Sequence, residues 1–366
     1  MHNRKSIKQF DWPLLILIVG ISAIGFVSIY SASVNYGSEF PYYLRQLVWF
    51  ALGLALLFAT TLIDYRFLCR LSFYAHLVCI GLLAIVLLYD TGGQEGHVNR
   101  WIKVGPLFLQ PSEFAKFTLA LYLAHYFNDS RRINDLGIGD IVWPLIVTLV
   151  PFVLIMVQPD LGTASILLIV AISVIFLVGL RLKIFLVTGI GSLVFLPIVW
   201  FFILKPYQRD RILTLIDPES DPLGKGYQII QSKIAVGSGK LWGKGFQEGT
   251  QVQLNFLPAR HTDFIFSVFT EEWGFIGGMT LIGMYLLLIA RCLQYVGKAK
   301  ERSGTILMVG VTSIFATQIA INIGMVLGLF PIVGMPLPFM SYGGSAMISN
   351  MIGMGLILNA RSRCYR

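Results

Sequence analysis

The sequence predicts an all-α polytopic membrane protein with about ten transmembrane helices. The chain has 366 residues, of which 56% are hydrophobic and only 13% are charged, and its mean hydropathy is +0.73. Soluble domains carry roughly twice that share of charged residues. The apolar residues also gather in long runs, and about 20 mostly apolar residues are enough for a helix to cross a hydrocarbon core of roughly 30 Å.

Ten apolar runs of suitable length follow one another along the chain. The first one ends without a small-residue cleavage site, so we expect a membrane span there and not a cleaved signal peptide. The predicted spans are 13–33, 46–64, 72–89, 107–127, 142–158, 161–180, 184–204, 264–290, 304–330 and 339–360.

The distribution of Lys and Arg predicts the orientation. Basic residues concentrate at the N-terminus, at the C-terminus and in alternate connecting segments, whereas the short loops on the other side hold only Arg45, Arg100 and Lys103. Cytoplasmic segments of membrane proteins carry this excess. We therefore place both termini in the cytoplasm. The net charge of +9 follows from this topology, and no nucleic-acid partner is expected.

Residues 205–262 form one long extracytoplasmic loop between the seventh and eighth predicted spans. The loop holds eight basic residues and many glycines and aromatics, and long loops escape the charge rule for insertion. Because it also has apolar patches, we expect an ordered cap on the outer face. The chain as a whole, 1–366, is predicted to be a single integral membrane domain.

The four cysteines do not indicate a disulfide or a zinc site. Cys69, Cys79, Cys292 and Cys364 lack metal-ligand spacing, and none is predicted on the oxidising side. We expect them to pack as small apolar side chains.

The fourth predicted span opens with opposite charges, in the stretch LQPSEFAKF. Glu113 and Lys116 are three residues apart, so they share a helix face and can pair. Ionisable side chains inside a bilayer are expensive and are functional candidates. Two interpretations stay open: a salt bridge that only permits burial, and a charged cavity wall in which Lys116 meets an anion.

A third acidic residue, Asp160, lies in a predicted turn between two spans, in the stretch QPDLGTAS. Pro159 and Gly162 suit a tight connection there. Asp160 is either the N-cap of the following helix, where it accepts a backbone N–H, or a residue that lines a cavity.

The densest polar cluster, PARHTDFIF, lies at the start of the eighth span. Asp263 there is either a helix cap, favoured by the helix dipole, or a general base tuned by burial and the dipole together. Glu271 and Glu272 would lie about 12–13 Å deeper on a straight helix, where carboxylates do not face lipid. Either the interior is polar, or 263–270 is re-entrant and the span starts near Trp273. In both cases Asp263 borders a polar cavity.

Near the C-terminus, the stretch PIVGMPLPFMSYGGSAMI (331–348) has three prolines followed by small polar residues. Prolines bar a regular helix before the last span. Small residues allow a helix or a ligand to approach closely, so we expect a structured re-entry with a polar edge.

Four of these stretches together resemble the SEDS family (shape, elongation, division and sporulation). LPARHTDFIFSVFTEEWGFIGG and GMPLPFMSYGGSAMI are similar to its two signature segments, and LQPSEFAKF and QPDLGTAS to two further motifs. The resemblance runs from the first span to the last. ARHTDF and PIVGMPLPF resemble the rod-shape branch, RodA. Ala259 stands where the family pattern leads us to expect a glutamate.

The resemblance implies a peptidoglycan glycosyltransferase that polymerises lipid II on the outer face of the bacterial cytoplasmic (inner) membrane, during elongation and rod-shape maintenance. By motif, Asp263 corresponds to the family's essential acid. Glu113 and Lys116 correspond to its paired cavity residues, and Asp160 to the acid of its turn. His261 and Thr262 are expected to support Asp263.

The implied reaction needs a base, charge neutralisation and access for a lipid. Asp263 is the predicted base. The diphosphate of the leaving group is expected to meet Lys116, Arg209, Arg211 and Arg260, and a divalent cation, Mg²⁺ or Mn²⁺, could help. No metal ligand set can be identified from the sequence. The implied partners are lipid II, membrane lipids, a class B penicillin-binding protein and the MreB, MreC and MreD elongation system.

Two other functions stay open. A flippase for a lipid-linked precursor would also use many spans and a cationic loop, although carriers tend to place their site near the midplane, and the polar residues here are predicted in the outer half. A non-catalytic scaffold of the elongation complex would explain the helix surfaces but not the buried charges.

Overall fold

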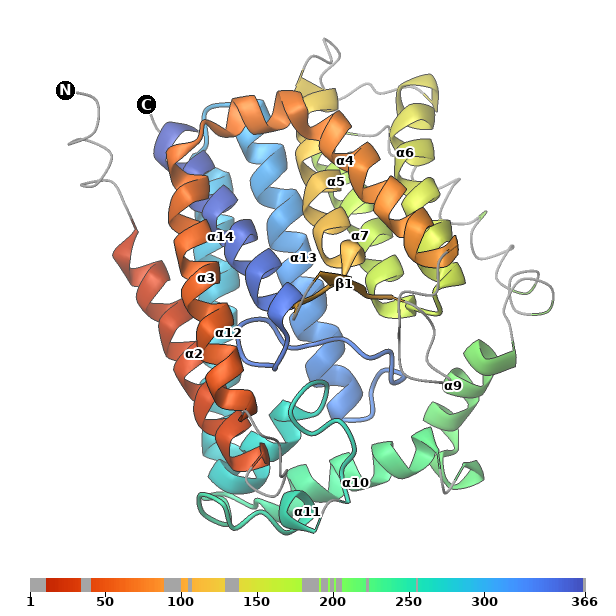
Figure 1. Cartoon of the computed structure of the whole chain (residues 1–366), viewed down its shortest axis with the longest axis vertical. Helices are drawn as coiled ribbons and strands as arrows, with labels where there is room; N and C mark the ends of the chain where they lie inside the picture. Colours follow the sequence, from red (N-terminus) through yellow and green to blue (C-terminus); the bar gives the residue numbers. More distant parts are fainter. Residues whose placement is uncertain are drawn as a thin grey trace.

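Long helices packed side by side form the body of the protein, and short helices lie across one end (Figure 1). The computed structural model describes residues 11–33, 41–88, 100–104, 107–128, 138–179, 206–221, 224–254 and 256–364, together with Gly191, Pro197 and Phe201. The long helices are α2 (Trp12–Ser33), α3 (Tyr42–Leu62), α4 (Tyr65–Leu88), α5 (Pro111–Asn128), α6 (Ile138–Val157), α7 (Leu161–Val178), α12 (Ile265–Lys298), α13 (Arg302–Val326) and α14 (Gly344–Cys364).

The prediction of a helical membrane protein is confirmed. Seven of the described helices are long and apolar enough to cross a membrane: α2, α3, α4, α6, α7, α12 and α13. Helices α5 and α14 occupy the positions of two more predicted spans but carry more polar residues. The predicted span at 184–204 lies almost entirely outside the described residues, so the count of ten stays a prediction.

The packing places α5, α13 and α14 inside the bundle. Helix α13 contacts α5, α7, α12 and α14, while α14 packs along α3 and α5 along α4. By contrast, α3 leaves many apolar side chains exposed, among them Leu47, Val48 and Leu52. An apolar surface of this extent on a span-length helix is the surface that contacts lipid.

The predicted span 107–127 begins too early. Residues Leu107–Leu109 form strand β2, which pairs antiparallel with β1 (Ile102–Val104). Helix α5 then starts at Pro111, where the fixed φ of proline suits the first helical position. The hairpin is the one β element of the described chain, and it brings Trp101 and Phe108 to the same place as the start of α5.

The loop of 205–262 is ordered over its described part, as predicted. It contains α9 (Pro206–Ile216), a 3₁₀ turn (Pro218–Ser220), α10 (Lys225–Ser238) and α11 (Thr250–Gln253). These elements lie across one end of the bundle (bottom of Figure 1), which we call the loop end. Helix α10 packs against α12, and the Ser232 hydroxyl donates to the carbonyl of Val326 at 2.8 Å.

Helix α12 is broken at Gly274. This break explains how Glu271 and Glu272 can be buried without lying in the membrane-crossing part of the helix. Gly274 has φ 68° and ψ −165°, a conformation that only glycine adopts without strain. The long membrane-crossing part therefore starts at Phe275. This is close to Trp273, the start that one of the two sequence interpretations predicts. Glu271 and Glu272 are buried before the break, at the loop end.

Both carboxylates accept hydrogen bonds from the loop. Glu271 Oε1 accepts from Lys244 Nζ at 2.6 Å and from the backbone N–H of Gln251 at 3.1 Å. Glu272 Oε1 accepts from the N–H of Gln247 at 3.2 Å and from the hydroxyl of Ser31 on α2. The two glutamates thus tie the loop to the bundle, and the ion pair with Lys244 offsets the cost of burying the Glu271 charge.

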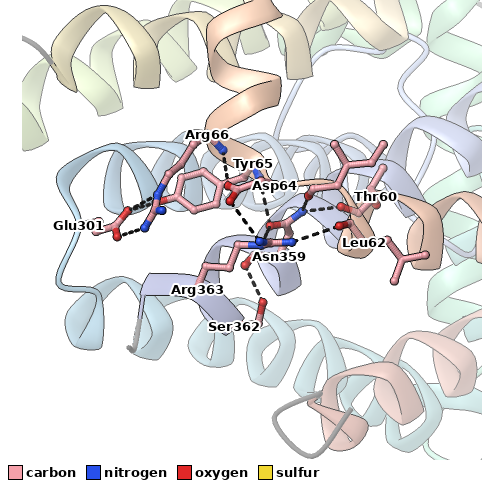
Figure 2. A network of polar contacts seen from close by, with 10 residues as sticks. Thr60, Leu62, Asp64, Tyr65, Arg66, Glu301, Asn359, Ser362 and Arg363 are labelled. Carbon is pink, nitrogen blue, oxygen red and sulfur yellow. Dashed lines mark hydrogen bonds and ion pairs between the residues drawn. The ribbon is translucent and has the colours of Figure 1, made fainter. Parts of the chain in front are cut away.

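A second polar network closes the end of the bundle opposite the loop end (Figure 2). Asn359 of α14 donates to the carbonyls of Thr60 and Ile63, at the C-terminal end of α3. Its side-chain oxygen accepts from the Tyr65 N–H at 3.3 Å and from Arg363 Nε at 3.0 Å. Asn359 therefore satisfies carbonyls that a helix end leaves without partners, and it joins α3, α4 and α14.

The predicted spans 304–330 and 339–360 are corrected at their facing ends. Helix α13 stops at Val326 and α14 starts at Gly344. The chain between them is irregular, as its prolines predict, and Gly334 has a φ of 71°. This irregular segment, 331–343, forms part of the site described next.

The cysteine predictions are tested for three thiols. Cys69, Cys79 and Cys292 are buried thiols, and the side chain of Cys364 lies outside the described residues.

Candidate active site

The signature segment PARHTDF folds as a tight turn in front of α12. Ala259 has a φ of 52°, and its carbonyl accepts from the N–H groups of Thr262 and Phe264 at 3.1 and 3.4 Å. Phe264, not Asp263, occupies the cap position of α12. Asp263 precedes it by one residue, so the interpretation of Asp263 as the N-cap residue is not the geometry found.

The turn delivers three polar side chains to a cavity of about 880 Å³. Its described lining includes His261, Thr262 and Asp263 from the turn, and Arg45 and Arg100 from two other parts of the chain. The remaining lining residues come from α3, the β1–β2 hairpin, the irregular segment and α14: Val48, Trp49, Leu52, Trp101, Phe108, Gln110, Gly334, Pro336, Tyr342, Gly343, Gly344 and Ala346. The cavity is large enough for a small-molecule or cofactor site.

Asp263 is the one carboxylate among these described lining residues. It faces the irregular segment at a glycine: a β-carbon added to Gly334 would lie 3.5 Å from Asp263 Oδ2. The site thus combines a single acid with two guanidinium groups, an arrangement suited to removing a proton and to binding an anion.

The backbone of Asp263 is held by Asn322, a fully buried residue of α13. The Asn322 amide donates to the carbonyl of Asp263 at 2.9 Å and to that of Met335 at 2.6 Å. A buried carbonyl left without a donor costs free energy, so these bonds fix the turn relative to the irregular segment.

Gln46 of α3 and Ser341 complete this support. The Ser341 hydroxyl donates to the carbonyl of Thr262 at 2.7 Å. Gln46 donates to the Ser341 carbonyl at 3.0 Å and accepts from the Gly343 N–H at 3.1 Å. The site is therefore assembled from α3, α13, the turn and the approach to α14, which are far apart in sequence.

His261 lies between two tyrosines. Its ring stacks on Tyr42 with 4.8 Å between centroids and meets Tyr342 edge-on at 5.7 Å. Burial, and next the nearby Arg260, lower the pKa of His261, which favours the neutral imidazole. Burial raises the pKa of Tyr342, and Arg45 opposes that rise.

Glu113 and Lys116 form a buried ion pair. Lys116 Nζ lies 2.9 Å from Glu113 Oε2, and the two side chains are 0% and 4% exposed. The same carboxylate oxygen accepts from the Ser349 hydroxyl of α14 at 3.1 Å. Neither residue is among the described residues that line the cavity. The geometry favours the salt bridge that permits burial over direct contact between Lys116 and an anion.

Asp160 is the N-cap of α7, as one of the two interpretations predicted. Its carboxylate accepts from the Thr163 N–H at 3.1 Å and from Gln110 Nε2 at 3.4 Å. Burial raises the pKa of Asp160, while Arg100 acts to lower it. Since Gln110 and Arg100 both line the cavity, Asp160 lies directly behind the cavity wall.

The sequence profile of the cell cycle proteins FtsW, RodA and SpoVE matches residues 11–365. The chain belongs to this family. Its curated relatives include the peptidoglycan glycosyltransferase MrdB of Escherichia coli, 39% identical over 351 residues that cover 96% of this chain and 93% of the relative. The peptidoglycan glycosyltransferase RodA of Treponema pallidum is 31% identical over 434 residues, covering 98% and 99%.

Solved structures of the FtsW/RodA/SpoVE family have the same fold. A chain from a peptidoglycan synthase complex, described for its coordination of polymerization and crosslinking, superposes with a TM-score of 0.82 at 35% identity, covering 98% of this chain and 99% of that one. The rod shape determining protein RodA of Thermus thermophilus superposes with a TM-score of 0.72 at 30% identity, covering 98% of each chain.

Three arginines predicted to bind diphosphate lie elsewhere in this family member. Arg260 is buried and donates to the carbonyl of Val252, so it braces the loop. Arg209 donates to the carbonyl of Phe201 at 2.9 Å. Arg211 lines a separate cavity between α7, α9 and α13. None of the three belongs to the described lining of the Asp263 cavity, and their role in binding diphosphate stays a prediction.

Arg45 and Arg100 take that position instead. Both were visible in the sequence as two of the three basic residues in the short outer loops, where the charge rule disfavours them. Arg100 also donates to the carbonyls of Gln158 and Pro159, both at 2.8 Å. The sequence did not predict that Asn322 and Gln46 hold the site together. A single amide side chain in an apolar helix does not show which carbonyl it will contact.

No group of three or more His, Cys, Asp or Glu side chains lies together in the described part of the chain. Asp263 is the one carboxylate among the described lining residues that could supply an oxygen ligand to a cation.

Proposed function

We propose that this FtsW/RodA/SpoVE family member polymerises lipid II in the Asp263 cavity. It is a peptidoglycan glycosyltransferase, as its curated relatives are. One observation carries the site assignment: Asp263, on a buttressed turn, shares a cavity of about 880 Å³ with Arg45 and Arg100. An acid and two cations in one cavity are the groups that this transfer needs.

Asp263 acts as the general base. It accepts the proton of the 4-hydroxyl of the acceptor GlcNAc while that oxygen attacks C1 of the donor MurNAc. The bond from C1 to the diphosphate oxygen breaks, and undecaprenyl diphosphate leaves with the bonding electrons. A single inverting displacement on an α-linked donor forms a β-1,4 linkage, so one base is sufficient.

Arg45 and Arg100 stabilise the departing diphosphate. Negative charge grows on the leaving group in the transition state, and preorganised cations placed there lower the barrier. The planar guanidinium group also suits bidentate contact with phosphate oxygens. His261 and Thr262 line the same wall and position the acceptor sugar, with His261 kept neutral.

The lipid tail reaches the cavity along α3. Val48 and Leu52 line the cavity and are also exposed on the apolar face of α3. The cavity is therefore continuous with the surface that contacts hydrocarbon. This geometry allows the sugars to meet Asp263 while the prenyl chain stays in the bilayer.

The family membership supports a proposal for the location and the partners of this chain. The chain is a multi-pass membrane protein, and we place it in the bacterial inner membrane with the loop end on the extracytoplasmic side. The solved relative in a peptidoglycan synthase complex supports a cross-linking partner, which we propose is a class B penicillin-binding protein. MreB, MreC and MreD stay further proposed partners. A divalent cation, Mg²⁺ or Mn²⁺, would reach the site on the diphosphate of the substrate.

Polymerisation of labelled lipid II by the purified chain, with and without the penicillin-binding protein, tests the function. Loss of a general base typically costs 10²–10⁴-fold, so Asp263→Asn should lose at least about 100-fold while inserting and melting like the parent. Full polymerisation by Asp263→Asn would overturn the assignment. Measuring lipid II flipping in the same proteoliposomes separates the alternative functions. Flipping without polymerisation would identify a flippase, and the absence of both activities would identify a scaffold.

A further inference from the structure

The connection between α10 and α11 exposes apolar side chains where a water-facing loop would bury them. Residues 239–247, which we call the Trp242 loop, include Trp242 at 80% exposure and Leu241 at 60%. Phe246 is exposed as well. Exposed aromatic and aliphatic side chains in one short segment mark an interaction surface.

The Trp242 loop is held rigidly against the break in α12. The N–H groups of Phe275 and Ile276 donate to the carbonyls of Lys240 and Leu241 at 2.8 and 3.2 Å. In the other direction, the Lys244 N–H donates to the Glu271 carbonyl at 3.0 Å. Gly243, with a φ of 84°, sits so close that a β-carbon there would collide with the Glu272 carbonyl. The loop therefore has a fixed position relative to a membrane-crossing helix.

The Trp242 loop lies at the N-terminal start of the membrane-crossing part of α12. The residues that follow the break, Phe275, Ile276 and Met279, are all exposed and belong to a candidate span, so they face lipid. The Leu241 carbonyl accepts a hydrogen bond from the Ile276 N–H. The Trp242 loop therefore starts at the depth where the lipid-facing surface of α12 starts.

A second membrane-crossing helix, α2, places the Trp242 loop at the same membrane depth. Phe246 stacks on Tyr30, with 6.2 Å between ring centroids and 12° between planes, and Tyr30 lies in the last turn of α2. Tyr30 also meets Tyr43 of α3 edge-on at 5.1 Å. Aromatic side chains gather at the boundary between hydrocarbon and water in membrane proteins, so this cluster marks that boundary at the loop end.

The charges beside the apolar residues fit the same location. Lys240 is exposed next to Leu241 and Trp242, whereas Lys244 is paired with Glu271. Amphipathic segments that lie in a membrane interface combine Trp and Leu on the buried side with Lys at the phosphates. A protein partner would not require the loop to be level with the ends of α2 and α12.

We propose that the Trp242 loop is an interfacial anchor that inserts Leu241 and Trp242 into the phospholipid leaflet at the loop end, with Lys240 at the phosphates. Since the same segment is bonded to Glu271 and Glu272, it sets the depth of the loop relative to the start of α12. This inference does not depend on the reaction proposed above.

Spin-label depth measurements on the full chain test the anchor. Trp242→Cys is made in a Cys364→Ser parent, whose remaining described cysteines are buried, and the labelled parent is the blank. Ser220→Cys, exposed on the 3₁₀ turn of the same loop, is the aqueous control. Leu286→Cys, exposed within the span of α12, is the hydrocarbon control.

In nanodiscs of phosphatidylethanolamine and phosphatidylglycerol, the label at 242 should collide with oxygen at least twice as often as the label at 220, and with a water-soluble nickel complex less often. A label at 242 that matches the one at 220 overturns the anchor. Shielding at 242 that appears only when a partner protein is added also overturns it, in favour of a protein-docking surface. Circular dichroism and the melting temperature of each variant confirm that the fold is retained.

Discussion

The side chain of Asn322 holds the backbone of Asp263: its amide donates to the Asp263 carbonyl at 2.9 Å, from a fully buried position on α13. The same amide group holds Met335 in the irregular segment. Asp263 is thereby fixed in place by a residue 59 positions along the chain. Its position depends on α13 as much as on its own turn.

Asn322→Ala should reduce turnover more than substrate binding. Two buried carbonyls lose their donor, which costs about 1–3 kcal/mol each in stability, and a shift of about 1 Å at a reacting group costs up to about 100-fold in rate. We expect kcat to fall about 10- to 100-fold and KM to change less than about twofold, measured with lipid II at a temperature where the variant is folded.

The control for Asn322 is Gln318→Leu, one turn earlier on α13. Gln318 is fully buried, and its amide atoms have no hydrogen-bond partner in the described structure. Gln318→Leu should keep kcat. A fall in kcat of equal size in both variants would show that any change in α13 is harmful and would contradict a specific role for Asn322.

Lys116 is expected to matter for stability before activity. Removing one partner of a buried ion pair leaves an uncompensated charge and costs about 3–5 kcal/mol, whereas replacing both partners is often close to neutral. Lys116→Met should therefore lower the melting temperature strongly in detergent, and Glu113→Gln with Lys116→Met should recover most of it. If Lys116→Met melts normally but cannot turn over lipid II, Lys116 takes part in binding the diphosphate after all.

Arg45 should contribute to substrate binding and Arg209 should not. Arg45 lines the Asp263 cavity, and a charge-assisted contact with phosphate is worth about 1.5–3 kcal/mol. Arg45→Gln should lower kcat/KM for lipid II about tenfold or more and weaken the dependence of kcat/KM on salt. Arg209→Gln, the same change in the loop outside the described lining, should leave both unchanged. Equal effects of the two changes would indicate general electrostatic attraction.

His261 should contribute to the loss of stability in acid. Burial holds its pKa below the ordinary value of 6.5, so the unfolded chain binds the proton at a higher pH than the folded chain. The contribution is therefore complete above about pH 6.5 and is lost as the pH falls from there toward the folded pKa. Melting curves between pH 7 and 5 should show a smaller decline for His261→Phe, which keeps the stacking on Tyr42, than for the parent. Parallel declines would mean that His261 does not titrate in this range.

A divalent cation should act through the substrate. The described residues supply no ligand cluster, and diphosphate oxygens bind hard cations well. We expect turnover to fall in excess chelator and to return when Mg²⁺ or Mn²⁺ is added. Turnover that is unchanged in excess chelator would remove the cation from the reaction.

Much of the architecture could be predicted because it depends on local composition. Apolar runs such as 161–180 became helices with nearly the predicted bounds, since in a bilayer each segment must satisfy its own backbone hydrogen bonds. The prolines before α14 and the cap at Asp160 are also local effects. The predicted start of the span at 107 was wrong because a hairpin competes with the helix there: Leu107–Leu109 pairs with Ile102–Val104 instead of extending α5.

The sequence by itself determined that the chain crosses a membrane, that it carries a polar cluster at Asp263, and that its motifs are those of the FtsW/RodA/SpoVE family. Only the tertiary structure decided which charges share the cavity with Asp263. Arg45 and Arg100 line it, whereas Lys116 is paired with Glu113 and Arg260 with the Val252 carbonyl. The physical reason is that a pattern of residues reports the cost of burying each charge, but the partner that offsets this cost comes from another part of the chain and is set only when the helices pack.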